Sequence, residues 1–228
     1  MLAASAFLGV DQLDALSKIT DKDRRYLAMT YYLRARSPIA ERWSWTNEEI
    51  KAYERSTEYT QALAEIEKIT TRFSTDNPGY LLRANTRSRS IEEQLLLWQT
   101  ESSVGSAAAE LRAHALATLA DRSYAAEPDE ASVRRFRDFL NGWRPSRRTT
   151  VMAPGLSLHG RGRAYDFQIL DKAGRTIADT RSSTVAAVWQ DQGWSEKLSQ
   201  AVHAASSRFT GPLENPNEPW HYEYQPDP

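Results

Sequence analysis

The first part of the chain has apolar residues that recur at helical spacing. Residues 11–36 carry apolar positions three and four residues apart, which predicts one or two amphipathic helices. Residues 46–73 continue this pattern, and the run Thr46-Asn47-Glu48-Glu49 has the form of a capping box that opens one long helix. The cluster Asp76-Asn77-Pro78-Gly79 is typical of a turn. We therefore expect a helical N-terminal region, residues 1–78, followed by a second domain, residues 79–228.

Beyond the turn, helices and short strands alternate with less regularity. Residues 80–84 predict a strand, and Ser90 with Glu93 predicts the capped start of a helix. Two further helices are expected at residues 105–120 and 129–140, within a helical insert that spans residues 101–141.

The pattern changes to a period of two near residue 164. Three polar or small positions, Ala164, Asp166 and Gln168, alternate with Tyr165, Phe167 and Ile169, which predicts a strand with one apolar face. Residues 171–174 predict a hairpin turn, and residues 183–189 a strand or the start of a buried helix. Ser195 is expected to cap a helix that runs to residue 207, and residues 220–224 predict another strand. Short strands with segregated helices indicate an α+β fold.

Composition limits the possible functions. The chain has 228 residues, of which 40% are hydrophobic and 26% charged, enough for an ordinary globular core. Its net charge of −1 argues against nucleic acid as the main partner. The absence of cysteine excludes disulfides, thiolate metal sites and a cysteine nucleophile.

The first ten residues are apolar but lack a basic segment before them. They are too short to span a membrane, so they represent either the remnant of a trimmed signal or anchor, or the start of a helix. No later stretch is apolar enough to cross a bilayer, so we expect no transmembrane segment.

Two segments combine histidine with carboxylates. Residues 157–166 contain His159 and Asp166, and residues 218–221 contain Glu218 and His221. Two imidazoles and one carboxylate are a sufficient ligand set for a catalytic zinc, with the fourth position left to water. A glycine at position 162 suits a turn that folds the first histidine back toward the aspartate. The alternative is a pair of ordinary, hydrogen-bonded histidines in two strands.

These segments resemble a known family. The pattern Ser-x-His-x-x-Gly-x-Ala-x-Asp, followed by Glu-x-Trp-His, is similar to that of the D-Ala-D-Ala metallopeptidases. That group includes the vancomycin-resistance D,D-peptidases, lysostaphin-like enzymes and hedgehog signalling domains. The matching positions are Ser157, His159, Gly162, Ala164, Asp166, Glu218, Trp220 and His221.

The resemblance implies a small antiparallel sheet with one zinc ion per chain in an open groove. It implies that His159, Asp166 and His221 hold the zinc. It also implies that Glu218 is the general base, which takes a proton from water and passes it to the leaving amine.

The resemblance also implies substrate-binding residues. An Arg-Ser-x-x-x-Gln element similar to that of the family begins at Arg89 and ends at Gln94, and its arginine is expected to bind the substrate's carboxylate. Arg83 and Arg87 are close competitors for this role. Ser157 is expected at the wall of the cleft, where it binds substrate or orients a metal ligand.

The implied substrate is a bacterial cell-wall peptide, cut at a bond that involves D-Ala. Such an enzyme acts outside the cytoplasm, so we expect an exported, periplasmic or cell-wall-associated protein. Three activities compete: a D,D-carboxypeptidase or dipeptidase, a peptidoglycan endopeptidase of the endolysin kind, and a non-catalytic zinc-containing binding module. Glu218 argues against the last, an arginine clamp favours the first, and the helical insert could shape the groove of the second.

Arginine is concentrated between residues 134 and 163, where eight arginines accompany one acidic residue. This excess suits either an anionic substrate or a solvated basic face. Only Arg161 and Arg163 are expected at the edge of the cleft. The remaining histidines, His114 and His203, are expected to be structural or exposed.

Overall fold

The computed structural model describes residues 7–35, 39–120, 129–214 and 216–226, and the chain divides into two compact units. The helical unit combines Met1–Thr46 with Arg89–Ser157. The sheet unit combines Asn47–Ser88 with Leu158–Pro228. Each unit is therefore built from two separate stretches of sequence, and the stretches of the two units alternate along the chain.

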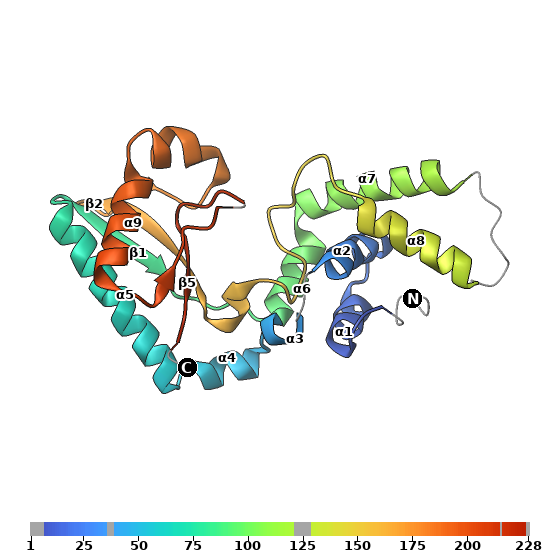
Figure 1. Cartoon of the computed structure of the whole chain (residues 1–228), viewed down its shortest axis with the longest axis horizontal. Coiled ribbons are helices and arrows are strands. Elements are labelled where there is room, and N and C mark those ends of the chain that lie inside the picture. Colours follow the sequence, from blue (N-terminus) through green and yellow to red (C-terminus); the bar gives the residue numbers. More distant parts are fainter. Residues whose placement is uncertain (1–6, 36–38, 121–128, 215, 227–228) are drawn as a thin grey trace. The chain divides into compact units, whose positions relative to one another are not determined.

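In the part of the helical unit that the structure describes, every regular element is a helix (Figure 1). Their apolar faces meet in a core around Trp98, which is fully buried and donates its indole N–H to the carbonyl oxygen of Arg24 at 3.1 Å. The helices are α1 (Val10–Lys18), α2 (Lys22–Arg34), α3 (Ile39–Arg42), α6 (Ile91–Thr100), α7 (Ser102–Leu119) and α8 (Glu130–Gly142).

The expected helices of this unit are confirmed, with small differences in their bounds. The stretch expected to form one or two helices forms two, the first beginning at Val10 and the second ending at Arg34. Residues 1–6, part of the apolar first segment, lie outside the described residues. Ser90 caps α6 by accepting a hydrogen bond from the backbone N–H of Glu93, as the sequence predicts. None of the described helices combines the length and apolar character needed to cross a membrane.

The sheet unit contains the strands and the helices that cover them (Figure 1). Its helices are α4 (Asn47–Tyr53), α5 (Thr57–Asp76) and α9 (Trp194–Ala205), together with the short turns η1 (Leu158–Arg161), η2 (Ser182–Thr184) and η3 (Val185–Gln190). Its strands are β1 (Tyr80–Asn85), β2 (Ala164–Asp171), β3 (Thr176–Ala178), β4 (Phe209–Thr210) and β5 (His221–Tyr224). The α+β class expected from the sequence is confirmed.

The sheet is antiparallel and small, with the order β1-β2-β5-β4 and with β3 also paired to β2. β2 is the central strand. It pairs with β1 on one side, where Arg83 lies opposite Gln168, and with β5 on the other, where Asp166 lies opposite His221. Three distant parts of the sequence thus become neighbours in the sheet, with β2 in the middle.

The two faces of the sheet differ in character. Along β2, Tyr165, Phe167 and Ile169 are buried in the core, as the period of two predicts. α5 and α9 cover this face and lie side by side in Figure 1. Side chains in the alternate register, such as Asp166 and Gln168, project from the opposite face, which we call the open face.

The single long helix expected at residues 46–73 is wrong in detail. The chain forms α4 and α5 instead, because Ser56 caps a new helix by accepting a hydrogen bond from the N–H of Tyr59. Of the two alternatives for residues 183–189, a strand or the start of a buried helix, the helical one holds, because residues 185–190 form a π-helical turn in which Trp189 is buried. Helix α9 begins at Trp194 after Gly193, so Ser195 lies inside the helix and is not its cap.

The expected boundary at residue 78 falls inside the sheet unit, between α5 and β1. Phe73 of α5 and Leu82 of β1 belong to one buried core, which holds the two elements together. The turn at Asp76–Gly79 is a local connection in this unit. A turn signal alone does not distinguish a connection of this kind from a boundary between domains.

This packing predicts the cost of core substitutions in the sheet unit. Leu198 of α9 is fully buried, whereas Leu81 of β1 is 48% exposed. Leu198→Ala should therefore lower the free energy of unfolding by about 2–5 kcal/mol, and Leu81→Ala by no more than about 1 kcal/mol. Urea denaturation followed by tryptophan fluorescence measures both, and equal losses would contradict the assigned core.

Candidate metal centre

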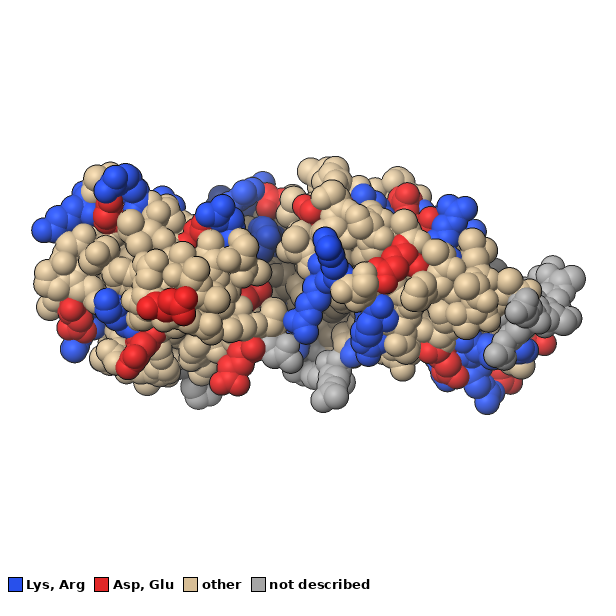
Figure 2. Space-filling view, turned by 90° about the horizontal axis from the view of Figure 1, so that it is seen from above, with Lys and Arg blue, Asp and Glu red and all other residues tan. Residues whose placement is uncertain are grey.

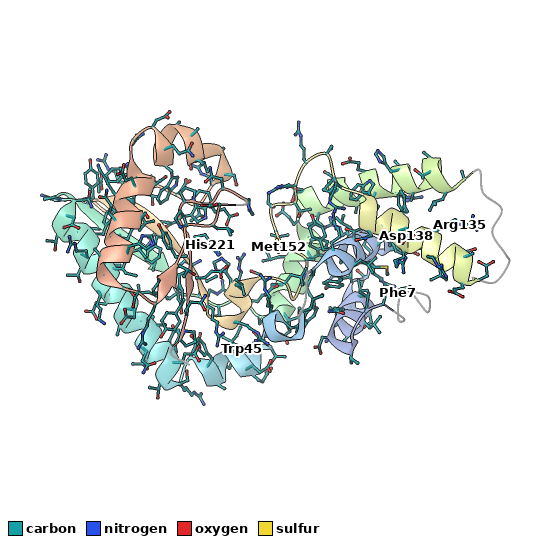
Figure 3. The ribbon with its side chains drawn as sticks, viewed as in Figure 1. Phe7, Trp45, Arg135, Asp138, Met152 and His221 are labelled. Carbon is teal, nitrogen blue, oxygen red and sulfur yellow. The ribbon has the colours of Figure 1, made fainter. Side chains whose placement is uncertain are left out.

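Strand pairing brings the first two residues of the centre together. Asp166 on β2 lies directly opposite His221 on β5, and both side chains project from the open face. In an antiparallel pair, side chains in this relation are close neighbours. The carboxylate oxygen Oδ1 of Asp166 lies 3.0 Å from Nδ1 of His221. His221 is labelled in Figure 3.

The third residue comes from the short turn η1, just before β2. Nε2 of His159 lies 3.5 Å from the other carboxylate oxygen of Asp166, Oδ2. The two imidazole rings are 5.1 Å apart and nearly perpendicular, and each histidine is only 7% exposed. One carboxylate therefore lies between two buried imidazoles.

These three side chains form a group that could hold a metal ion. Their nearest nitrogen and oxygen atoms all lie within 4.8 Å of one another. A tetrahedral ion with ligand bonds of about 2.0–2.1 Å separates its ligand atoms by about 3.3 Å, close to the two distances from Asp166. Donor type, spacing and burial all fit a bound divalent cation.

Gly162 shapes the connection between η1 and β2. Its φ of +61° lies in the left-handed region, and a Cβ there would come within 2.2 Å of the ring of Tyr53. Its carbonyl oxygen accepts hydrogen bonds from the hydroxyls of Tyr53 at 3.2 Å and Tyr165 at 2.6 Å. Two phenols from different elements therefore fix the backbone three residues after His159.

Both of these phenols remain neutral donors at neutral pH. Burial is the main cause that raises the pKa of Tyr53, to about 12, and burial also raises the pKa of Tyr165.

Glu218 lies beside the metal-binding group but outside it. The backbone N–H of His221 donates to the carbonyl oxygen of Glu218 at 3.0 Å, which closes a tight turn between them. Oε2 of Glu218 is 3.8 Å from Nδ1 of His221, and its side chain is 28% exposed. Trp220, which is 3% exposed and packs against Trp189, anchors this turn in the core.

The electrostatic surroundings of His221 favour positive charge. Burial lowers its pKa, but the hydrogen bond and charge of Asp166, with further contributions from Glu218 and Glu223, outweigh burial and raise the pKa above the ordinary 6.5. The same carboxylates favour any cation held at this place.

The expected substrate-binding residues, Arg89, Gln94 and Ser157, belong to the helical unit, whereas the metal-binding group and Glu218 belong to the sheet unit. Gln94 is buried, and its amide makes three hydrogen bonds within the helical unit, to Ser44, to the carbonyl oxygen of Arg89 and from the N–H of Gly155. The carbonyl oxygen of Ser157 accepts a hydrogen bond from the hydroxyl of Ser44. These contacts give Gln94 a structural role inside its own unit.

The other two histidines are exposed and lie on helices. His114 accepts a hydrogen bond from the indole N–H of Trp143 at 3.2 Å, and Nδ1 of His203 lies 2.8 Å from the carbonyl oxygen of Ser199. Both match the structural or exposed role expected from the sequence.

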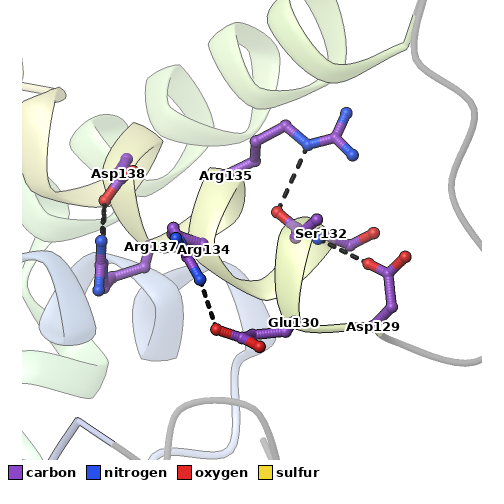
Figure 4. Close-up of polar contacts among 8 residues, drawn as sticks. Asp129, Glu130, Ser132, Arg134, Arg135, Arg137 and Asp138 are labelled. Atoms are coloured by element: carbon purple, nitrogen blue, oxygen red, sulfur yellow. Dashed lines mark hydrogen bonds and ion pairs between the residues drawn. The ribbon is translucent and has the colours of Figure 1, made fainter.

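Several arginines of the basic segment have acidic partners nearby. Arg134 pairs with Glu130 on α8, and the guanidinium of Arg137 bonds the carboxylate of its neighbour Asp138 (Figure 4). On the face shown in Figure 2, basic and acidic side chains are interspersed. In the sheet unit, Nε of Arg163 lies 3.6 Å from a carboxylate oxygen of Glu58.

Sequence reasoning missed the two phenols that hold the turn carrying His159. Tyr53 is 109 residues from Gly162, and no local pattern links them. The sequence analysis also gave no role to Gln168. The period-two spacing of Asp166 and Gln168 already indicated that both side chains lie on the same face of the strand.

The chain was compared with known protein families, curated proteins and solved structures. No protein-family model, no curated protein and no solved structure matches the chain.

The contacts of Gly162 predict the effect of an alanine substitution there, which can be compared with the same substitution at Gly174. Gly162→Ala should weaken Zn²⁺ binding about 10- to 100-fold, because the added methyl clashes with Tyr53 and displaces the turn that carries His159. Gly174 also has a positive φ, of +77°, but an added Cβ there meets no atom within 4 Å. Gly174→Ala controls for backbone strain and should leave the affinity unchanged in a competitive zinc titration. Equal losses in the two variants would contradict this account of Gly162.

The ligand set predicts loss of metal from two histidine variants. His159→Ala and His221→Ala should each lose the bound metal, since either change removes one of three candidate ligands. His203→Ala, on the exposed face of α9, should retain it. Elemental analysis after gel filtration measures all three, and full metal content in either of the first two variants would exclude this group as the site.

Proposed function

We propose that the chain is a zinc-dependent peptidase that hydrolyses D-Ala-containing peptides of bacterial peptidoglycan, as a D,D-carboxypeptidase. The observation that carries the proposal is Glu218, a partly exposed carboxylate that lies beside the His159–Asp166–His221 group without belonging to it. A structural or binding module does not need an additional base at this place. Hydrolysis does, because water must lose a proton as it attacks.

Zinc is the metal we propose, since two imidazoles and one carboxylate match the ligands of catalytic zinc sites. When bound, zinc polarises the carbonyl of the scissile bond and lowers the pKa of a water molecule. Three protein ligands leave a position for that chemistry, and Asp166 and Glu218 keep 18% and 28% of their side chains exposed.

Glu218 is assigned the proton transfers. Its carboxylate accepts a proton from the attacking water, holds it, and donates it to the amine that leaves as the peptide bond breaks. The turn between Glu218 and His221, anchored by Trp220, fixes the distance between the base and the nearest ligand. Asp166 contributes negative charge between the two imidazoles.

Support for the substrate class comes from the sequence pattern that resembles the D-Ala-D-Ala metallopeptidases. Peptidoglycan lies outside the cytoplasm, so the proposal includes export. The direct test is to incubate the purified protein with defined muropeptides and to identify products by mass spectrometry. Loss of a terminal D-Ala supports a carboxypeptidase, cleavage within a cross-link supports an endopeptidase, and unchanged muropeptides with zinc bound would refute the proposal.

The proposed base predicts a separation of metal binding from activity. Glu218→Gln should keep stoichiometric zinc but lower kcat by about 10²- to 10⁴-fold, because the amide cannot accept the proton. Glu214→Gln, an exposed residue of the same loop, is the matched control and should retain full activity. Turnover of a peptide ending in D-Ala-D-Ala and the zinc content are measured on the same samples. Near-normal turnover of Glu218→Gln with zinc bound would remove Glu218 from this role.

A further inference from the structure

We propose that Asn85 donates a hydrogen bond from its side-chain amide to the carbonyl oxygen of the scissile bond as that oxygen becomes negatively charged. The inference rests on the proposed peptidase function and deepens it, because it names a catalytic residue at a position outside the sequence pattern that supports that function. Glu218 and the three metal-binding side chains are assigned to the water and the cation, so this oxygen has no hydrogen-bond donor among them.

The register of the sheet places Asn85 beside the metal-binding group. Asn85 is the last residue of β1 and lies directly opposite Asp166 on β2, which lies opposite His221 on β5. Directly opposite residues of an antiparallel pair have their side chains on the same face, with Cβ atoms about 4.5–5.5 Å apart. Asn85, Asp166 and His221 therefore form one row across three strands.

The burial of the neighbouring residues agrees with this orientation. On β1, Leu82 belongs to the buried core and Ala84 packs against it, whereas Arg83 and Asn85 are exposed. The side chains of β1 thus alternate between the core and the open face, as those of β2 do. The amide of Asn85 is accessible to a ligand at the group.

A local hydrogen bond orients the amide of Asn85. Its oxygen, Oδ1, accepts from the backbone N–H of Arg87 at 3.2 Å, in the two-residue pattern of an Asx turn. With Oδ1 engaged in the turn, the two N–H groups of Nδ2 remain available as donors. Among the residues that the structure describes, none accepts a hydrogen bond from Nδ2.

The amide has the length to reach an oxygen at the group. Two bonds of about 1.5 and 1.3 Å carry Nδ2 about 2.5 Å from Cβ. A hydrogen bond adds about 2.9 Å, which brings the reach to about 5.4 Å. This reach matches the separation of directly opposite Cβ atoms, so Nδ2 can contact an oxygen that lies over Asp166.

Glu218 and Asn85 lie on opposite sides of β2. Oε2 of Glu218 is 3.8 Å from His221 on β5, whereas Asn85 belongs to β1. A substrate carbonyl that receives water from the β5 side can present its oxygen toward β1. As the new carbon–oxygen bond forms, the electron pair of the carbonyl double bond moves to that oxygen, which is where Asn85 donates.

The contact favours the transition state over the substrate. An amide N–H binds a negatively charged oxygen more strongly than a neutral carbonyl oxygen, so the bond strengthens as the charge develops. Removing one donor of this kind typically lowers kcat by about 10²- to 10³-fold. A carboxamide also keeps its donors at every pH at which Glu218 can act as a base.

Two substitutions at one position separate the donor from the turn. Asn85→Ala removes both, whereas Asn85→Asp keeps an oxygen for the N–H of Arg87 but has no N–H at neutral pH. On a peptide ending in D-Ala-D-Ala, both should keep zinc and KM and lower kcat about 10²- to 10³-fold. Asn141→Ala, an exposed amide of α8, is the control and should behave as wild type. Full kcat in Asn85→Asp would assign Asn85 to the turn alone and overturn the inference.

A binding experiment separates failure of this inference from failure of the proposed function. The probe is a phosphinate analogue of D-Ala-D-Ala, whose tetrahedral anionic centre resembles the transition state, titrated by calorimetry into zinc-loaded protein. Asn85→Ala should weaken its binding about 10- to 100-fold, yet leave unchanged the affinity of Glu218→Gln protein for the uncleaved peptide. This pattern without hydrolysis by wild type would retain Asn85 as the donor and refute the peptidase. Equal affinity of wild type and Asn85→Ala for the analogue, or no binding by wild type, would overturn the inference.

Discussion

The pairing of β2 with β5 is the constraint on which the candidate centre depends. Antiparallel register sets which side chains lie opposite one another, and a slip of one residue would move Asp166 to the buried face. The core prevents such a slip, because Tyr165 and Phe167 on β2, and Tyr222 on β5, must remain buried together. Apolar burial on one face of the sheet thus fixes the position of a charged group on the other.

The second constraint acts on the turn before β2. His159 is not part of the sheet, so strand register does not position it. Its place depends on a backbone conformation that only glycine adopts easily at position 162, and on two phenol hydroxyls that satisfy one carbonyl oxygen. Two of the candidate ligands lie on paired strands and the third lies on a turn held by two hydrogen bonds. These side chains have little freedom to rearrange, and such preorganisation would favour the affinity for a cation.

The sequence predicted features that depend on neighbouring residues. The alternation around Asp166 and the cap at Ser90 could be read from local patterns, and the structure contains them. The meeting of His159, Asp166 and His221 was expected from the resemblance of two separate motifs, and the structure brings these residues together. The break before Ser56 was missed because the apolar stripe continues across it, and periodicity alone does not reveal where one helix stops. The interleaved units were missed because unit membership depends on long-range packing. The hydrogen bonds from Tyr53 to Gly162 and from Arg83 to Gln168 span 109 and 85 residues, and no local pattern encodes them.

The central position of β2 has a consequence for the order in which this protein can fold. Arg83 and Gln168 are 85 residues apart, and Asp166 and His221 are 55 apart, so the sheet requires the closure of two long loops. Closing a loop costs conformational entropy before its contacts form, and topologies of this kind fold slowly. Helices α6, α7 and α8 lie within the first of these loops, and their early formation would shorten the flexible chain that must be closed. The His159–Asp166–His221 group should therefore assemble late in folding, when β2 has acquired both of its neighbouring strands. The rate at which an added cation becomes bound during refolding would measure that time.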